Sequence, residues 1–223
     1  MSQPEAQIAT IVSPPPFEEN SFVAHLKGRS DCLVIDPGLE PEKILAYLQT
    51  HGLRPAAILN THGHSDHIAG NAALKQRWPD CPLVIGAGDA VKLTDPAQNL
   101  SRAFGIDLVS PAADATVEDG ETYSAAGFDL EVRAIPGHSA GHVVFLWTGQ
   151  SPYIVFVGDV IFDGSIGRTD FPDGSFEGLR EGIHSKLFTL PDDTLLLPGH
   201  GGPTTVGQEK RSNPYVGLRA AEE

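Results

Sequence analysis

The sequence is poor in cysteine and in basic residues, and it has no long uninterrupted hydrophobic run. Its 223 residues include only two cysteines, Cys32 and Cys81, which are too few for a disulfide framework and which we expect to be small buried apolar residues. The longest apolar region, residues 143–157, is interrupted by residues 148–152, so it does not qualify as a membrane span. The N-terminus carries no basic stretch followed by an apolar run, and we therefore expect a cytoplasmic protein.

Basic residues are also few relative to acidic ones. Lysine and arginine number 15 against 29 aspartates and glutamates, which gives a formal net charge of −14. Such an excess repels phosphate backbones and anionic lipid surfaces, so neither nucleic acid nor a membrane is expected as a partner. A content of 40% hydrophobic and 20% charged residues is typical of a globular protein, and we expect a single domain over residues 1–223.

Hydrophobic periodicity predicts an α/β protein whose two halves each combine strands with helices. Apolar residues at helical spacing predict helices over residues 41–51, about 68–77 and 176–187, with a short one over 89–93. Apolar or alternating runs predict strands over residues 6–12, 21–26, 32–35, 56–59, 82–85, 130–134, 143–147, 153–157 and 194–197. Residues 94–111 lack a pattern and indicate a loop over a pocket. We expect two sheets packed face to face with helices outside.

Three of the nine histidines fall within six residues, in the segment THGHSDH. In an extended chain His62 and His64 project to the same side and can converge on one point. A turn into the following helix can aim Asp66 and His67 at a second point a few Å away, as in two-metal hydrolytic sites. Imidazoles with carboxylates suit Zn, Fe, Mn or Ni rather than Ca or Mg. The alternative is a solvated loop of titrating histidines.

Three further candidate ligands follow predicted strands. His138 lies in PGHSAGH, Asp159 in VGDV and His200 in PGHGG, each beside a glycine. Side chains from distant parts of a chain converge at the ends of neighbouring strands, and the glycines allow the backbone to turn sharply there. These residues are the expected remainder of a metal site.

In this order, THGHSDH, PGHSAGH, VGDVIFDGSIGRTDF and LPGHGGPTT resemble the motifs of the metallo-β-lactamase superfamily, over about residues 36–215. The chain is similar within it to short glyoxalase II-like (hydroxyacylglutathione hydrolase-like) enzymes. The resemblance implies an αβ/βα four-layer sandwich of two mixed sheets with a dinuclear site along one edge. By motif position it implies that one metal is bound by His62, His64 and His138, a second by Asp66, His67 and His200, and both by Asp159.

The function implied by this resemblance is that of a metal-dependent hydrolase with two divalent ions, zinc first, with iron or manganese as alternatives. Our hypothesis is that a metal-bridging hydroxide, oriented by Asp66, attacks the carbonyl carbon of a thioester such as a hydroxyacyl-glutathione. Other functions stay open: an iron-dependent persulfide dioxygenase, a lactonase or β-lactamase-type hydrolase, and a non-catalytic metal-binding module. The sequence lacks the long helical extension that would help to grip glutathione, so glutathione recognition also stays open.

Three residues outside the ligand set have weaker predictions attached. Arg168 is a candidate for binding a small anionic substrate, although an ion pair with Asp170 or Asp173 would also account for it. His142 is expected to be a hydrogen-bond partner behind the site. Asp36 either orients a ligand imidazole or caps a turn. The oligomeric state is not predicted.

Overall fold

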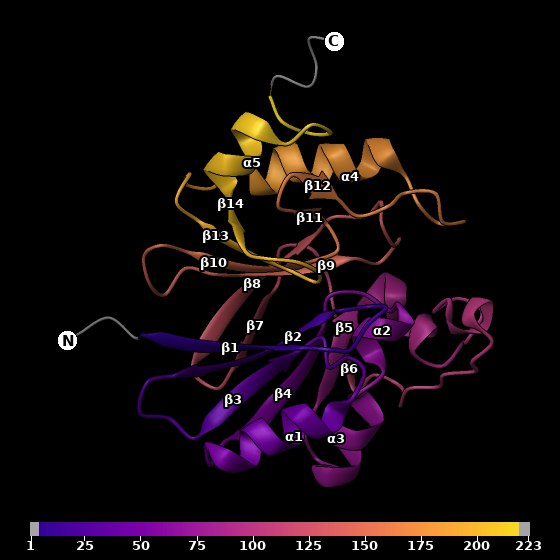
Figure 1. Ribbon diagram of the computed structural model, residues 1–223. Helices are drawn as coiled ribbons and strands as arrows, with labels where there is room; N and C mark the ends of the chain where they lie inside the picture. The colour runs from indigo at the N-terminus through magenta and orange to yellow at the C-terminus, as the bar shows by residue number, and fades with distance from the viewer. Residues whose placement is uncertain (1–4, 219–223) are drawn as a thin grey trace.

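The computed structural model describes residues 5–218 and divides most of its strands between two six-stranded sheets (Figure 1). The first sheet consists, in spatial order, of β1 (Ala6–Val12), β2 (Asn20–Leu26), β3 (Asp31–Ile35), β4 (Arg54–Asn60), β5 (Leu83–Gly86) and β6 (Ala115–Val117). The second consists of β14 (Thr204–Thr205), β13 (Leu195–Pro198), β10 (Ile154–Gly158), β9 (Val143–Trp147), β8 (Phe128–Ala134) and β7 (Thr122–Ala125). A small hairpin pairs β11 (Ile161–Phe162) with β12 (Ser165–Ile166).

Both sheets are mixed. In the first, β1, β2 and β3 pair in antiparallel fashion, whereas β3 to β6 are parallel. In the second, β8, β10 and β13 run in the same direction, because β9 lies antiparallel between β8 and β10 and β13 pairs in parallel with β10. The carboxyl ends of these three strands therefore meet at one edge of the second sheet.

Helices cover the outer face of each sheet, giving four layers (Figure 1). Below the first sheet in Figure 1 lie α1 (Pro41–Thr50) and α3 (Asn71–Arg77); above the second lie α4 (Phe176–Gly182), its π-helical continuation η3 (Ile183–Leu187) and α5 (Val206–Ser212). The predicted αβ/βα sandwich is confirmed. Among the described residues, no helix is both long and apolar enough to cross a membrane.

The apolar residues form three layers because each central strand is buried on both faces. In β3, Leu33 and Ile35 join the core between the sheets, whereas Cys32 and Val34 join the core beneath α1. Alternating side chains of a strand point to opposite faces, so a continuous apolar run serves two cores. The free thiols of Cys32 and Cys81 are buried, as expected from their sequence contexts.

The helix predicted over residues 68–77 is two helices, α2 (Ser65–Ile68) and α3, and the break at Gly70 matters for the site. The Gly70 N–H donates to Pro37 O at 2.8 Å, and a Cβ at this position would lie 2.9 Å from Gly38 O. The chain therefore turns close against residues 37–38, which leaves Asp66 and His67 on a single helical turn next to β4.

Two further differences concern the unpatterned region and short strands. The short helix predicted over residues 89–93 is present as part of the 3₁₀ helix η1 (Ala87–Leu93). A second 3₁₀ helix, η2 (Ser101–Phe104), lies within the region 94–111, for which no helix was predicted. The strands β6 and β7 were not predicted, because three or four residues give too little alternation to recognise.

Candidate metal centre

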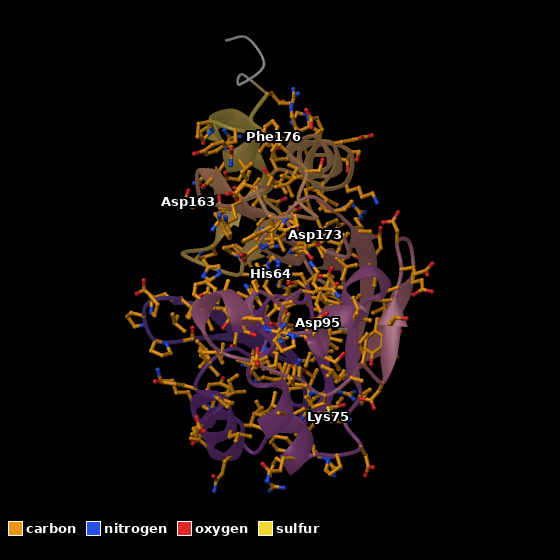
Figure 2. The ribbon with its side chains drawn as sticks, turned by 90° about the vertical axis from the view of Figure 1, so that its right-hand side faces the viewer. His64, Lys75, Asp95, Asp163, Asp173 and Phe176 are labelled. Carbon is orange, nitrogen blue, oxygen red and sulfur yellow. The ribbon has the colours of Figure 1, made fainter. Side chains whose placement is uncertain are left out.

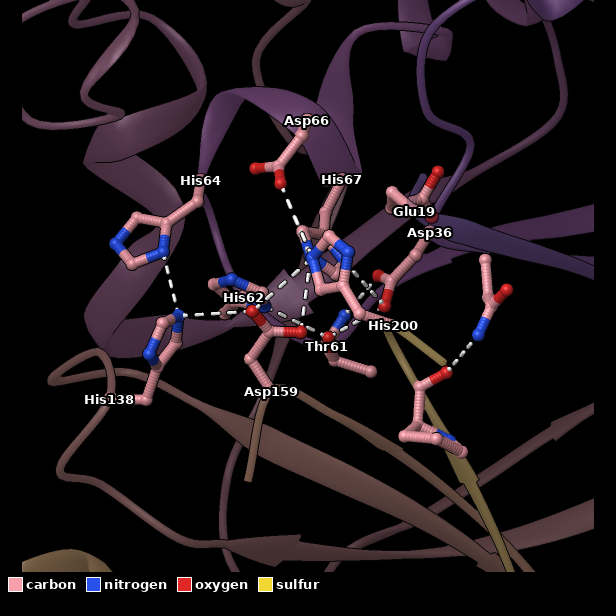
Figure 3. Close-up of polar contacts among 12 residues, drawn as sticks. Glu19, Asp36, Thr61, His62, His64, Asp66, His67, His138, Asp159 and His200 are labelled. Atoms are coloured by element: carbon pink, nitrogen blue, oxygen red, sulfur yellow. Dashed lines mark hydrogen bonds and ion pairs between the residues drawn. The ribbon is translucent and has the colours of Figure 1, made fainter. Parts of the chain in front are cut away.

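Seven side chains from distant parts of the chain meet between the two halves of the molecule (Figure 3). Figure 2 places one of them, His64, at mid-height between the sheets. Their nitrogen and oxygen atoms form three overlapping groups, and within each group all the candidate ligand atoms lie within 4.8 Å of one another. The groups are His62–His64–His138, His62–His67–Asp159 and Asp66–His67–His200. The structure thus brings together every ligand position predicted from the sequence.

Strand ends place these side chains. His62 and His64 follow β4, His138 follows β8, Asp159 follows β10 and His200 follows β13. Gly158, at the end of β10, has a φ of +49°, and a Cβ there would collide with the side chain of Thr61. Only glycine fits a positive φ with so close a neighbour, so this position fixes where Asp159 emerges.

Four of the five imidazoles are held through Nδ1. This nitrogen lies 2.9 Å from Arg168 O in His138, 2.9 Å from Phe17 O in His200, 3.2 Å from an Asp36 carboxylate oxygen in His67 and 3.1 Å from Thr61 Oγ1 in His62. A carbonyl or carboxylate oxygen can only accept, so Nδ1 of His138, His200 and His67 must donate its proton. The Nε2 atom of each of these three rings is then the nitrogen left to bind a cation at the centre of the cluster, the arrangement found around metal-bound histidines.

The cluster leaves several buried polar atoms without hydrogen-bond partners, and this observation tests whether a metal fits. Nε2 of His62 and His67 and Oδ1 of Asp159 are buried without a hydrogen bond, although Nε2 of His67 and Oδ1 of Asp159 lie 3.4 Å apart. Nδ1 of His64 lies 2.9 Å from Nε2 of His138, so two ring nitrogens face each other. Unpartnered buried acceptors are costly, and a cation shared by nitrogens and carboxylate oxygens satisfies them together. The donor set therefore fits a transition-metal ion.

Asp159 lies between the groups (Figure 3). Its carboxylate oxygens lie 3.4 Å from Nε2 of His67, 3.5 Å from that of His200 and 3.6 Å from that of His138. Burial alone would raise the pKa of Asp159, but these neighbouring imidazoles outweigh it and hold the pKa below its usual range. The carboxylate is therefore ionised at neutral pH and faces both sides of the cluster.

The imidazoles differ in protonation when no cation is present. Burial, reinforced by His138, lowers the pKa of His64 to about 3, and burial likewise holds the pKa of His62 well below its usual value. Burial would also lower the pKa of His67, but the carboxylates of Asp159 and Asp66 reverse the effect and hold it well above. A cation entering the cluster therefore finds His62 and His64 neutral and displaces a proton at His67.

Asp36 connects the cluster to the first sheet. Its Oδ1 accepts from the Thr61 N–H at 2.7 Å, and its Oδ2 accepts from Thr61 Oγ1 at 2.7 Å and from His67 Nδ1 at 3.2 Å. Of the two roles predicted for Asp36, contact with a cluster imidazole is confirmed. We infer that this buried carboxylate fixes the orientation of the His67 ring.

Replacing Asp36 by asparagine is expected to weaken metal binding by about 10- to 100-fold. The amide keeps the size of the carboxylate but removes its charge and one acceptor, so His67 and Thr61 lose part of their anchor. A titration against a competing chelator measures the change. Asp31→Asn, which alters an exposed ion pair with Arg29 at the start of β3, is the matched control and should bind metal as the native chain does.

His142 lies behind the cluster, as predicted. Its Nε2 accepts from the backbone N–H of Asp159 at 3.2 Å, and its ring stacks on that of His62 with centroids 4.7 Å apart and an interplanar angle of 13°. His142 therefore forms a hydrogen bond with the backbone of Asp159, and its contact with the His62 imidazole is by stacking.

A buried network around Asp89 holds two of the contributing loops together, and sequence reasoning missed it. The Asp89 carboxylate accepts from the N–H groups of Gly63 and Gly141, each at 2.8 Å, and from the Ser139 hydroxyl. Lys92, only 4% exposed, donates to Ser139 Oγ at 2.5 Å and to Asp173 Oδ2 at 2.6 Å. Asp89 thus connects the backbone between His62 and His64 to the loop after His138. The signal for it was present, because Asp89 follows a strand end as Asp159 does.

Asp89→Asn is expected to reduce the free energy of unfolding by about 1–3 kcal/mol, because the amide cannot accept all three bonds and leaves a buried donor unsatisfied. Urea denaturation of the two chains, with an unchanged denaturant dependence, checks this value. Asp129→Asn, at an exposed position on β8, should change the free energy of unfolding by no more than about 0.5 kcal/mol. If Asp89→Asn and the native chain have the same free energy of unfolding, the network does not stabilise the fold by holding the two loops together.

Arg168 lies at the rim of the cluster's cavity. Its guanidinium pairs with Asp170 through two contacts of 2.7 Å and stacks over the Phe171 ring at 4.5 Å. The ion pair with Asp170 that was weighed against substrate binding is therefore present, whereas Asp173 pairs with Lys92 instead. Substrate binding by Arg168 stays a prediction.

The sequence and the fold of this chain are similar to those of known proteins. Residues 14–200 match the family model described as the metallo-beta-lactamase superfamily. The chain is 38% identical over 202 residues to the probable metallo-hydrolase YqgX of Bacillus subtilis, covering 90% of this chain and 93% of that one. It is 37% identical to the hydroxyacylglutathione hydrolase GloC of Haemophilus influenzae, covering 84% and 88%. A crystal structure of TTHA1623 in a di-iron-bound form superposes with a TM-score of 0.81 at 36% identity, covering 93% and 99%.

Proposed function

This chain belongs to the metallo-beta-lactamase superfamily, and from that premise we propose that it hydrolyses thioesters such as a hydroxyacyl-glutathione. The superfamily is one of metallo-hydrolases, and the similarity to GloC supports the thioester among the possible substrates. The observation that carries the proposal is the convergence of five imidazoles and two carboxylates at a cavity.

We assign His62, His64 and His138 to one divalent ion, Asp66, His67 and His200 to a second, and Asp159 to both. Zinc is our first choice, with iron or manganese as alternatives, since each accepts mixed nitrogen and oxygen ligands. When bound, two such ions supply Lewis acidity and a hydroxide nucleophile at neutral pH.

The chain's own residues position the substrate and orient the attacking water. The oxygen of water forms a bond to the thioester carbonyl carbon while the water gives up one proton, and the carbon–sulfur bond breaks. The sulfur leaves as thiolate, the carboxylic acid product gives up the second proton, and both protons pass to solvent. Asp66, whose side chain is 17% exposed, reaches the cavity and can accept a hydrogen bond from the attacking water. Nε2 of His200 lies 3.4 Å from Oδ2 of Asp66, so the two side chains meet at the same point of the cluster.

Elemental analysis coupled to an anaerobic assay with S-lactoylglutathione tests the proposal. Two metals per chain and turnover without oxygen are expected. One iron per chain with oxygen uptake on glutathione persulfide would replace hydrolysis by the dioxygenase reaction. Turnover of nitrocefin or a lactone, with none of any thioester, would move the activity to another hydrolase class.

Metal content and activity should fall together below about pH 6, because protons and metal ions compete for the same imidazoles. A metal-bound imidazole must be neutral, so lowering the pH favours the protonated, metal-free cluster. Elemental analysis of samples dialysed between pH 5 and 8, with kcat/KM from the same samples, measures both. Activity that persists in samples shown to hold no metal would contradict the assigned ligands.

A further inference from the structure

The cavity beside the cluster is largely apolar. It has a volume of about 670 Å³, and five residues of the cluster are among those that line it: His64, Asp66, His138, Asp159 and His200. Four phenylalanines from separate segments line its walls, together with Leu100, Ala103 and Ile166. An apolar cavity with its polar groups gathered at one end is typical of a site that recognises an apolar part of a small molecule.

The phenylalanines are placed to receive such a group. Phe17, before β2, and Phe104, in η2, meet edge to face with ring centroids 5.4 Å apart, and Phe104 is 60% exposed. Phe171 lies 5.0 Å from the His64 ring and 5.5 Å from that of His138, so the apolar wall begins at the cluster itself. Phe162, on β11, lies 6.1 Å from the ring of His200 on the other side. Binding of an apolar ligand against an exposed aromatic ring is favourable, because it removes the apolar surface of the ring from water.

A separate hollow of about 40 Å³ lies next to the cavity. It shares Phe17, Ser65, Asp66 and Phe104 with the cavity's lining, and Leu39 and Ile106 also line it. The Phe17 and Phe104 rings therefore border apolar space in both places.

The polar lining offers little to a glutathione carrier. Glutathione brings two carboxylates and one ammonium, whereas the only fixed cation among the lining residues is Arg168, which Asp170 already engages twice at 2.7 Å. Lys92, the nearest buried cation to His64, is 4% exposed and committed to Ser139 and Asp173. A charged group without a partner keeps its hydration instead of binding.

We propose that the substrates are thioesters with an apolar acyl group, and that the site selects the acyl chain rather than the thiol carrier. The carbonyl lies at the cluster and the alkyl chain lies along Phe17 and Phe104. This inference rests on the proposed thioester hydrolysis and specifies its substrate class.

A series of acetyl, butyryl and hexanoyl thioesters of N-acetylcysteamine tests it, with S-lactoylglutathione for comparison. We expect kcat/KM to rise about threefold to fourfold for each added methylene, the gain for burying one such group. The kcat/KM for hexanoyl-N-acetylcysteamine should therefore exceed that for S-lactoylglutathione. Equal rates along the series, or S-lactoylglutathione as the best substrate, would overturn the inference while leaving thioester hydrolysis intact.

Two variants and a binding measurement separate the pocket from the chemistry. Phe104→Ala should reduce the hexanoyl-to-acetyl ratio of kcat/KM by about tenfold, whereas Phe176→Ala, which removes a 40% exposed ring on α4 away from the cavity (Figure 2), should keep the native ratio. Calorimetry with the hexyl thioether of N-acetylcysteamine, which cannot be hydrolysed, measures binding alone. Phe104→Ala should bind this thioether about tenfold more weakly than the native chain. Chain-length-dependent binding without hydrolysis of any thioester would retain the pocket and reject the proposed function; unchanged ratios in Phe104→Ala would reject the pocket.

Discussion

Asp66→Asn is expected to lower kcat for a thioester by about 10²- to 10⁴-fold, the range for losing a group that positions or takes a proton. The amide has the size of the carboxylate but lacks its charge, so it does not orient the attacking water as an anion does and brings no negative charge to His200 Nε2, 3.4 Å away. Each factor of ten corresponds to about 1.4 kcal/mol in the barrier. Steady-state kinetics on samples of known metal content measure the loss.

The same variant separates two roles of Asp66. If the residue serves only to hold a metal, excess metal in the assay restores kcat; if it also orients the nucleophile, kcat stays low when elemental analysis finds the native metal content. Asp193→Asn, an exposed aspartate before β13, is the matched control and should keep native kcat. Native kcat in Asp66→Asn would remove this residue from the reaction.

The strands that carry the site were predictable because each is a compact apolar run. Val143–Trp147 and Ile154–Gly158 are buried at every position, and a continuous apolar run of this length is typical of a strand covered on both faces. The break between α2 and α3 was not predictable in this way, since it depends on the close approach of Gly70 to residues 37–38, which lie far away in the sequence. Tertiary contact decided that boundary, not local propensity.

Within the site, the residues in dense motifs were found and the isolated ones were not. Histidines with glycine neighbours stand out in a sequence, whereas Glu19 looks like any surface glutamate after a proline-rich turn. In the structure its side chain is fully buried, and burial raises its pKa well above the usual value. Lys92 was likewise recognisable only through its partners, whereas the position of Asp89 just after a strand was a signal that stood outside any dense motif.

The buried charged and polar groups of the cluster lie close together, so we expect removal of the metal ions to have a large effect on thermal stability. We expect chelation to lower the melting temperature by about 8–16 °C for each tightly held ion. Metal bound only to the folded chain stabilises it by about 4 kcal/mol when its concentration is a thousandfold above Kd, and each kcal/mol shifts the melting temperature of a chain of this size by about 2–4 °C. Calorimetry before and after dialysis against a chelator, and again after metal is restored, measures the shift and its reversal.

Asp159→Asn provides the comparison that ties this shift to the cluster. Its carboxylate faces both groups of imidazoles, so the amide should bind metal weakly and show a much smaller change on chelation, whereas Asp193→Asn should show the full native shift. A shift of equal size in Asp159→Asn would mean that the stabilising ion lies elsewhere on the chain. No shift in the native protein, with elemental analysis confirming that metal was present and then removed, would mean that the cluster folds to the same stability without its ions, and that the unpartnered nitrogens of His62 and His67 are not there to hold a metal.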